Sequence, residues 1–425
     1  MTKTNTLGMT GVLVSLLALP IMAAGPAPDS DWNQWKGPKR DGLSPDTGLL
    51  KEWPTGGPPL AWKATGIGTG FSSVSVHGGK IYTMGEAGNA FNLVALSAAD
   101  GKVLWTTKIA DLPEKAVKNE RDYPGPRGTP CTDGSLVITL APYGDLLCAD
   151  ASTGKEKWRK QAGRDFGAGG RSDWMYAESP LLDGDTVVFS PGGSKGTVAA
   201  LKKETGEPIW QSADLTDAAC YSSLVPAEIG GKKQYLILTA SHVAGIESAT
   251  GKVLWKIERK GKVAVIPDPV YKDDIVFVSS GYGLGCNAYK ISGGADGWKA
   301  EEIYSGPQII NHHGGVLLVG DHLYELDDKN KLKCADIKTG KIAWEEPSVG
   351  KGSIAYADGH LIVRSEKNPG TIALVDASPE GYKERGRFNP PDASKKQIWP
   401  HPVIIGGKMY IRDQDVLLCY DVKAK

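Results

Sequence analysis

Polar and charged side chains recur at one position of a repeat that runs through most of this 425-residue chain. The position is usually Ser or Thr, but three of its eight occurrences are Asp268, His313 and His401. If the repeats surround an axis, these side chains converge on it. Carboxylates and imidazoles that converge in a hollow can bind a polar ligand or hold a divalent metal. The sequence therefore predicts a binding site at the axis of the repeats.

The residues beside this position enlarge the candidate site with cations, a second carboxylate and aromatic rings. The expected ligand-binding residues are Arg127, Trp174, Tyr176, Glu178, Asp268, Asn311, His313, Lys351, Trp399 and His401. Flat rings suit a planar ligand, and the guanidinium of Arg127 suits a carboxylate. Because Arg127 and Lys351 are cations, we expect the carboxylates among these residues to stay ionised. No residue in the set is assigned a catalytic role.

Two other interpretations of these residues stay open at this point. The side chains can simply fill a wet channel with hydrogen bonds. A metal site would use His312, His313, His401, Asp268 and Glu178. Neighbouring residues of a strand point to opposite faces, so at most one of His312 and His313 is expected to face the axis. Because the spacing matches no metal-ligand signature, no metal is predicted.

The element that must position these residues is a short β repeat. A Gly followed four residues later by Trp occurs five times, at 100–105 (DGKVLW), 153–158 (TGKEKW), 205–210 (TGEPIW), 250–255 (TGKVLW) and 339–344 (TGKIAW). Gly favours a turn, and the β-prone run that ends in Trp suits a strand packed against a neighbour. A segment that recurs in this way along a chain is typical of repeat architectures. We therefore expect a β-propeller.

The repeated small-residue position sets the number of blades. It occurs eight times at intervals of roughly 47 residues, within the range of propeller blades. Each unit resembles four short strands joined by Gly or Asp turns. The segments 296–304 (DGWKAEEIY) and 380–388 (EGYKERGRF) depart from the pattern, because their aromatic residue directly follows Gly. The prediction is an all-β, eight-bladed propeller of four-stranded antiparallel blades.

The last unit lacks its Trp strand, and a segment that can replace it lies near the N-terminus. No Trp follows in 411–425, whereas 58–64 (PPLAWKA) carries Trp62. An N-terminal strand in the last blade would close the ring and leave no unpaired edge there. The expected organisation is a signal peptide at 1–24, a strap at 25–57 and a single propeller domain at 58–425.

The first residues predict export to the periplasm or secretion. Lys3 precedes an apolar run at 9–22 that is followed by small residues, so cleavage is expected near Ala23 or Ala24. The run is too short for a transmembrane anchor. The chain has 49 basic and 49 acidic residues and no net charge. This balance disfavours nucleic acid as a partner.

Six cysteines in an exported chain raise the question of disulfides. Cys148, Cys334 and Cys419 hold the same strand position in different repeats, where a small buried residue is expected. Cys220 and Cys286 belong to adjacent repeats, and whether they pair stays open.

The repeat resembles the tryptophan-docking motif of pyrroloquinoline-quinone (PQQ) type propellers. That group includes quinoprotein alcohol dehydrogenases and the propeller lipoprotein of the outer-membrane β-barrel assembly machinery. Four segments are similar to secreted, stand-alone PQQ-like repeat proteins of planctomycete-type bacteria: DWNQWKGPKRDGLS at 31–44, AESPLLDGD at 177–185, NHHGGV at 311–316 and WPHPV at 399–403. The resemblance covers nearly all of 31–425 and implies the propeller fold, although one fold serves many activities.

This resemblance leaves two classes of function. One is a non-catalytic propeller that binds a small-molecule ligand or a protein partner through its faces. The other is a PQQ-dependent dehydrogenase, in which Glu178, Asn311 and Asp268 would hold Ca²⁺ and Trp174 or Trp399 would stack on the quinone. The chain lacks the Cys-Cys pair and the CxxCH haem motif, and it is shorter than such enzymes. These absences favour binding over catalysis.

Overall fold

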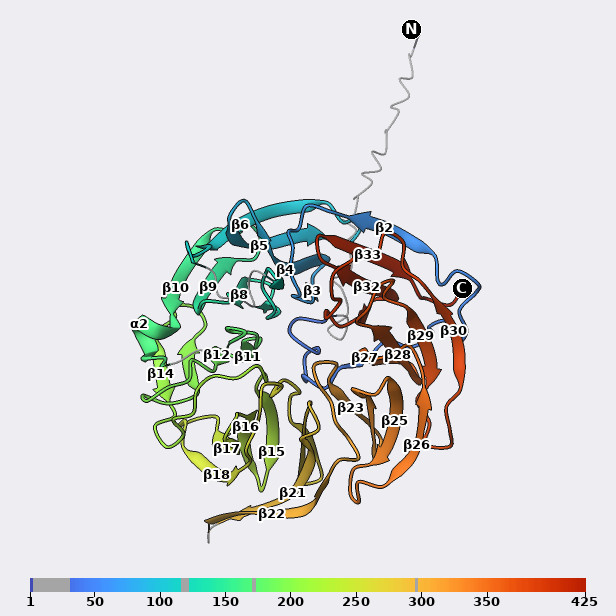
Figure 1. The fold of residues 1–425 in the computed structure, drawn as a ribbon. Coiled ribbons are helices and arrows are strands. Elements are labelled where there is room, and N and C mark those ends of the chain that lie inside the picture. The colour runs from blue at the N-terminus through green and yellow to red at the C-terminus, as the bar shows by residue number, and fades with distance from the viewer. Residues whose placement is uncertain (3–30, 116–121, 170–172, 295–296) are drawn as a thin grey trace.

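A computed structural model describes residues 1–2, 31–115, 122–169, 173–294 and 297–425. These residues form eight β-sheets around one axis (Figure 1), seven with four strands and one with five. Within each sheet, consecutive strands pair antiparallel. The expected all-β, eight-bladed propeller is therefore confirmed. All but the first two residues of the predicted signal peptide lie outside the described residues.

The blades use consecutive strands, ordered from the axis to the rim. Blades 1 to 4 contain β3 (Ser75–His77), β4 (Lys80–Ala87), β5 (Ala90–Ser97) and β6 (Val103–Asp111); β7 (Cys131–Thr132), β8 (Leu136–Leu140), β9 (Asp145–Asp150) and β10 (Glu156–Gln161); β11 (Leu181–Asp183), β12 (Thr186–Phe189), β13 (Ala199–Lys202) and β14 (Pro208–Gln211); and β15 (Val225–Ile229), β16 (Lys232–Leu238), β17 (His242–Glu247) and β18 (Val253–Glu258). The short helix α2 (Ala162–Phe166) follows β10.

Blades 5 to 8 continue the pattern until the last blade. They contain β19 (Val270–Lys272), β20 (Ile275–Ser280), β21 (Gly285–Gly294) and β22 (Gly297–Gly306); β23 (Val316–Val319), β24 (His322–Leu326), β25 (Lys331–Asp336) and β26 (Ile342–Pro347); β27 (Gly352–Ala357), β28 (His360–Ser365), β29 (Ile372–Asp376) and β30 (Glu384–Phe388); and β31 (Val403–Ile405), β32 (Lys408–Asp413), β33 (Val416–Asp421) and β2 (Leu60–Ala64). The short strand β1 (Leu43–Ser44) pairs parallel with β27.

Apolar side chains fill the spaces between neighbouring blades. The described residues form eight buried clusters, one at each junction between adjacent blades. The middle strands are buried on both faces, so a strand such as β8 consists almost entirely of apolar residues instead of an alternating pattern. Burial between blades is what holds the ring together.

The repeated Trp links each blade to the next. Trp158 in blade 2 donates from Nε1 to the carbonyl of Lys203 at 2.7 Å. Its ring covers Gly206 of blade 3, where a Cβ atom would lie 2.7 Å from the indole and φ is +69°. Two constraints therefore require Gly at this turn: the positive φ and the close approach of the ring. Trp62 covers Gly101 in the same way, across the junction of blades 8 and 1.

The two departures from the Trp pattern have different structural solutions. In blade 5, Tyr304 is the docking residue: it covers Gly340 and donates its hydroxyl to the carbonyl of Ile337 at 2.8 Å. In blade 7 the docking position is Gly386, and Trp53 from the strap packs against it. Both segments nevertheless belong to blades with four consecutive antiparallel strands, as the sequence predicts.

The ring closes as the sequence predicts. Strand β2 pairs with β33, and Trp62 lies opposite Cys419. Arg412, which is 1% exposed, donates to the carbonyls of Gly68 and Ser72 at 2.9 and 3.0 Å. Because these carbonyls belong to the segment that enters blade 1, Arg412 joins the last blade to the first at the axis.

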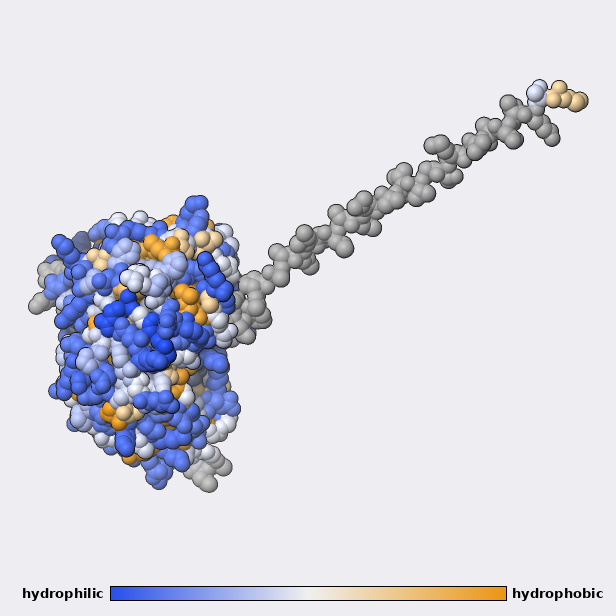
Figure 2. Space-filling view, turned by 90° about the vertical axis from the view of Figure 1, so that its right-hand side faces the viewer, coloured by the Kyte–Doolittle hydropathy of each residue, from blue (hydrophilic) through white to orange (hydrophobic). Residues whose placement is uncertain are grey.

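The side of the molecule that faces the viewer in Figure 2 is mostly polar. Figure 2 shows the rim near β2 and β30, where apolar residues occur in small groups among hydrophilic ones. Among the described parts of the chain, no helix has the length and hydropathy that a membrane crossing needs.

Candidate functional site

The repeated position found in the sequence forms hydrogen bonds between blades. The amide of Thr129 donates to Oγ of Ser179 at 2.8 Å, and the amide of Ser179 donates to Oγ of Ser223 at 3.0 Å. The amide of Ser223 in turn donates to Oδ1 of Asp268 at 2.7 Å. A side-chain oxygen at this position satisfies a buried amide of the preceding blade, which explains why hydroxyl residues recur there.

Asp268 departs from the hydroxyl pattern because its second oxygen holds the strap. Oδ2 accepts a hydrogen bond from Nε1 of Trp35 at 2.7 Å and forms an ion pair with Nζ of Lys36 at 3.2 Å. The two charged side chains are only 5% and 6% exposed. Since a buried charge needs a close partner, this pair fixes the strap at the axis.

The strap closes one end of the central channel. Strap residues 32–34 hydrogen-bond to Val76, Thr132 and Leu182 in the first strands of blades 1 to 3. The residues that line the open part of the channel come five positions earlier in the same blades. Arg127, for example, lies five positions before Thr132. The strap therefore lies at the far end of the inner strands, and in Figure 1 its blue trace passes through the centre of the ring.

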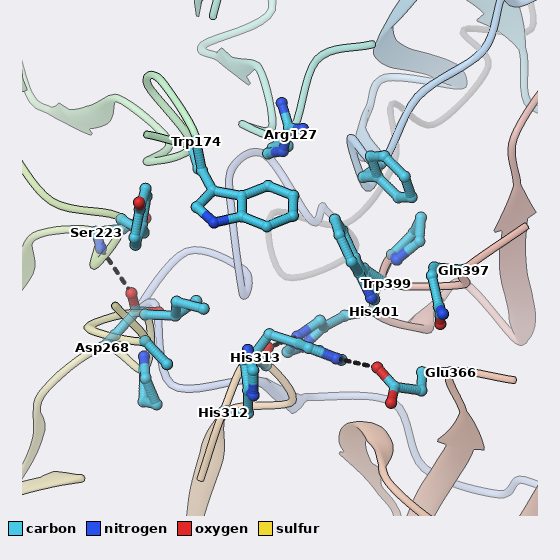
Figure 3. Close-up of a pocket in the computed structure, with 18 of the residues that line it drawn as sticks. Arg127, Trp174, Ser223, Asp268, His312, His313, Glu366, Gln397, Trp399 and His401 are labelled. Carbon is cyan, nitrogen blue, oxygen red and sulfur yellow. Dashed lines mark hydrogen bonds and ion pairs between the residues drawn. The ribbon is translucent and has the colours of Figure 1, made fainter. Parts of the chain in front are cut away.

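Above the strap the channel holds a cavity of about 340 Å³, a volume within the range of small-molecule sites. Trp35 and Lys36 of the strap form its floor. Seven of the ten residues expected at the axis line it: Arg127, Trp174, Asp268, His313, Lys351, Trp399 and His401. Figure 3 shows these walls, with Trp174 and Trp399 facing the side of Asp268, His312 and His313.

The other three expected residues lie inside the blade walls. Tyr176 is buried and donates its hydroxyl to the carbonyl of Pro191 at 2.7 Å. Asn311 accepts from the amide of Gly315 at 2.9 Å and donates to the carbonyl of Leu326 at 3.2 Å. Both side chains thus satisfy local backbone groups, and the expected convergence on the axis does not extend to them.

Glu178 is the third of these residues, and its expected ionisation was wrong. It is 1% exposed and accepts from the amide of Ser190 at 2.5 Å. Burial raises the pKa of Glu178 to about 8, although that amide and Arg40 act in the opposite direction. The side chain is therefore mainly neutral at pH 7.

Both His312 and His313 line the cavity, contrary to the expectation that only one would. Residues 312–314 form a bend before β23 begins, so the alternation of an extended strand does not apply to them. Nε2 of His313 lies 2.6 Å from Oε2 of Glu366, and Nδ1 of His312 lies 2.8 Å from Nζ of Lys351.

The imidazoles and the carboxylate in this part of the cavity differ in charge. Burial lowers the pKa of His313, against the opposing effect of Glu366. Burial opposes ionisation of Glu366, but its hydrogen bond with His313 and the charge of Lys351 outweigh burial and lower the pKa of Glu366. The pair is thus a neutral imidazole donating to a carboxylate. His401 is also neutral, because burial and the charge of Lys36 lower its pKa to about 3.

Aromatic rings form the wall that faces Asp268, His312 and His313 (Figure 3). Tyr123 and Trp399 stack with centroids 5.4 Å apart, and Phe71 lies 4.3 Å from Trp399. Trp174 is inclined at 71° to Trp399. The guanidinium of Arg127 lies 5.6 Å from the Trp174 ring, which is cation–π distance.

Several lining residues were missed by sequence reasoning. They are Trp35, Lys36, Tyr123, Tyr282, Glu366 and Gln397. Trp35 and Lys36 carried a usable signal, because two Trp and several cations cluster in 31–44 outside any expected strand. Glu366 and Gln397 belong to connections whose local sequence has no special pattern.

The metal interpretation finds no support in this geometry. Within the described ranges, no group of three or more His, Cys, Asp or Glu side chains is placed to hold a metal ion. Asp268 is instead engaged by the strap, and His313 by Glu366.

Comparison with known families identifies the repeat. A family model described as outer membrane protein assembly factor BamB matches residues 89–346 and 287–378. The chain belongs to this BamB family. The BamB of Xanthomonas campestris pv. campestris is 24% identical over 405 residues, covering 83% of this chain and 95% of the relative. The BamB of Burkholderia pseudomallei is 22% identical over 238 residues, covering 54% and 58%. A polyvinylalcohol dehydrogenase of Sphingopyxis is 27% identical over 165 residues, 35% of this chain and 25% of that protein.

Solved structures agree on the fold. BamB from Moraxella catarrhalis has a TM-score of 0.55 at 15% identity, with 80% of this chain and 94% of that chain covered. The designed protein Ika8 has a TM-score of 0.60 at 12% identity, with 86% and 100% covered. At these identities the likeness shows the propeller fold alone, and function must be argued from the site.

Proposed function

We propose that the protein is an exported binding module whose axial cavity takes a small-molecule ligand or a group presented by a protein partner. One observation carries the proposal: the channel is a one-ended cavity, with the strap as its floor and several blades as its walls. Aromatic and polar side chains that converge in such a hollow are typical of a binding site. The candidate ligand-binding residues are the seven predicted residues on the cavity wall, together with the lining residues described above.

The proposed location is the periplasm or the exterior of the cell. The apolar run at 9–22 followed by small residues supports export. The description of the family as an outer membrane protein assembly factor supports action in the cell envelope and a protein partner. A propeller face is a suitable surface for such a partner, because its loops surround the cavity mouth.

The residues do not fit the PQQ and Ca²⁺ of a quinoprotein dehydrogenase. Glu178 and Asn311 are buried in the blade walls, and burial raises the pKa of Glu178 to about 8. Asp268, the third expected Ca²⁺ ligand, is paired with Lys36. The six cysteines include no adjacent pair. We therefore favour binding over a quinone-dependent reaction.

A thermal-shift screen tests the proposed binding function. The purified full-length protein is heated with a library of small metabolites and, separately, with PQQ plus Ca²⁺. A cavity ligand should raise the Tm by mass action, and Trp174→Ala should remove the shift. Trp298→Ala, which changes a half-buried Trp of β22 outside the cavity, is the matched control and should keep it. A shift with PQQ and Ca²⁺ alone would contradict the proposal.

Fractionation tests the proposed location. A tagged chain expressed in a Gram-negative host should appear in the periplasmic or secreted fraction. Deletion of residues 3–24 should leave it in the cytoplasm. Equal distribution of both forms would contradict export.

A further inference from the structure

We infer that the axial cavity binds a saccharide, an uncharged ring whose hydroxyl groups are held by Lys351, Glu366 and Gln397 between inclined aromatic walls. This inference rests on the proposed function, because it names the ligand class of the same cavity. Three independent features of the walls carry it.

The first feature is charge balance. Lys36 is paired with Asp268 at 3.2 Å, and Lys351 lies 3.4 Å from Asp328 and 3.9 Å from Glu366. Each lysine on the wall thus already has a carboxylate partner. Burying a further charge without its own partner is unfavourable, so these contacts favour an uncharged ligand. A cationic ligand is further disfavoured, because Arg127 already occupies the face of Trp174.

The second feature is a pair of polar groups that a single ligand hydroxyl can bridge. Lys351 and Glu366 both line the cavity, and Nζ of Lys351 lies 3.9 Å from Oε1 of Glu366, beyond hydrogen-bond distance. A hydroxyl placed between them accepts from the ammonium and donates to the carboxylate. Oε2 of the same carboxylate is held by His313 at 2.6 Å, which fixes Oε1 in position.

The third polar group is the amide of Gln397. It lines the cavity, and its side chain makes no hydrogen bond to any described residue; Oε1 is a buried acceptor without a partner. An amide both donates and accepts, so it matches a second hydroxyl. Leaving the buried Oε1 unpaired is unfavourable, and a ligand hydroxyl that donates to it would relieve that cost.

The shape of the aromatic wall favours a puckered ring over a flat one. A planar ligand binds best between parallel rings. Here Trp174 is inclined at 71° to Trp399 and at 48° to Tyr123. The most nearly parallel of these pairs, Tyr123 and Trp399, is inclined at 25° with centroids only 5.4 Å apart, which leaves no room for a third ring between them. Inclined faces suit the C–H surfaces of a sugar ring.

The test is direct titration of the full-length protein. Glucose, galactose, N-acetylglucosamine, rhamnose, cellobiose and maltose are measured by saturation-transfer NMR and calorimetry, beside p-hydroxybenzoate and PQQ as flat, anionic comparators. At least one saccharide should bind. Gln397→Leu should weaken it by roughly fivefold, the effect of one hydrogen bond. Trp174→Ala should weaken it by about tenfold or more.

Matched controls separate the site from general damage. Lys395→Ala alters an exposed residue of the same connection, and Trp298→Ala removes a Trp outside the cavity; both should bind as wild type does. Since the side chain of Gln397 makes no hydrogen bond to any residue that the structure describes, Gln397→Leu should keep the wild-type Tm.

The outcomes distinguish this inference from the proposed function. No saccharide binding, or binding that neither Gln397→Leu nor Trp174→Ala weakens, overturns the saccharide inference. If p-hydroxybenzoate or another non-sugar binds and Trp174→Ala abolishes it, the inference fails while the cavity remains a binding site. If neither this panel nor the metabolite library binds, both fail.

Discussion

Nζ of Lys36 and Oδ2 of Asp268 lie 3.2 Å apart at the axis, and both side chains are almost fully buried. One belongs to the strap and the other to the connection that enters blade 5. This ion pair turns an open channel into a cavity with a floor, because it holds the strap across the ring.

Asp268→Ser is therefore predicted to destabilise the protein by about 3–5 kcal/mol, since it leaves Lys36 buried without a partner. The serine hydroxyl can still accept from the amide of Ser223, as Ser and Thr do in other blades. Adding Lys36→Met to Asp268→Ser should restore much of the lost stability. Urea unfolding followed by Trp fluorescence measures the free energy of unfolding of each variant.

An exposed pair provides the control. Lys202 and Glu207 lie 2.8 Å apart, with both side chains 61% exposed. Glu207→Gln should change the free energy of unfolding by less than about 1 kcal/mol. If Asp268→Ser costs no more than Glu207→Gln, the buried pair does not anchor the strap.

Trp158→Ala is predicted to cost about 3–5 kcal/mol of unfolding free energy. The side chain is 8% exposed, covers Gly206 and donates to the carbonyl of Lys203. Its removal leaves a hole between two blades and takes the indole donor from the carbonyl of Lys203. Chemical denaturation should show a much smaller loss for Trp298→Ala. Equal losses would mean that the repeated Trp has no special part in joining the blades.

The stability that Glu178 and Glu325 contribute is predicted to fall as the pH rises from about 5 to 8. Burial raises the pKa of Glu178 and of Glu325 to about 8 in the folded chain. The unfolded carboxyls release their protons near pH 4.5, so over this window only the unfolded state is ionised. The stability that the two neutral carboxyls contribute is thus fully present below the pKa of the unfolded state. It declines as the pH rises toward the folded pKa, with a slope of about 1.4 kcal/mol per pH unit for each group.

Glu178→Gln tests that pH effect. Because Gln cannot ionise, the variant should lose one of the two contributions, and its Tm should fall less than that of wild type between pH 5 and pH 8. Glu346→Gln, at an exposed position, should keep the wild-type profile. Identical profiles for Glu178→Gln and wild type would contradict a neutral Glu178.

All six cysteines are predicted to be free thiols, which answers the question left open for Cys220 and Cys286. Five are buried and Cys220 is half-buried. Burial raises the pKa of both Cys220 and Cys286 to about 11, so neither reacts readily at neutral pH. Ellman's reagent should detect six thiols in denaturant without reductant, and at most Cys220 promptly in the native protein. Four thiols in denaturant would indicate a disulfide.

The sequence by itself determined the ring, its eight blades and the strand that closes it. Those features depend on local patterns: a turn glycine, a β-prone run and an aromatic residue that recur at a fixed interval. Where the pattern fails, other residues occupy the place: the ring of Tyr304 in blade 5, and the backbone and Cβ of Trp53 against Gly386 in blade 7.

The sequence also selected the axis and most of the side chains that face it. The shared repeat position places Asp268, His313 and His401 where the chain enters blades 5, 6 and 8. Glu178 and Asn311 share nearly that position, yet each turns toward a backbone amide within a blade. Both residues lie in irregular segments before the inner strands, where strand alternation does not apply, so sequence spacing alone could not resolve which side chains face the channel.

Only the tertiary structure decided that the channel has a floor and a site above it. The path of the strap depends on contacts between residues more than two hundred positions apart, such as Trp35 and Asp268. No local propensity encodes such a path, because its energy comes from partners that meet only once the ring has formed. The cavity, its charge balance and the place of Glu366 and Gln397 follow from that assembly.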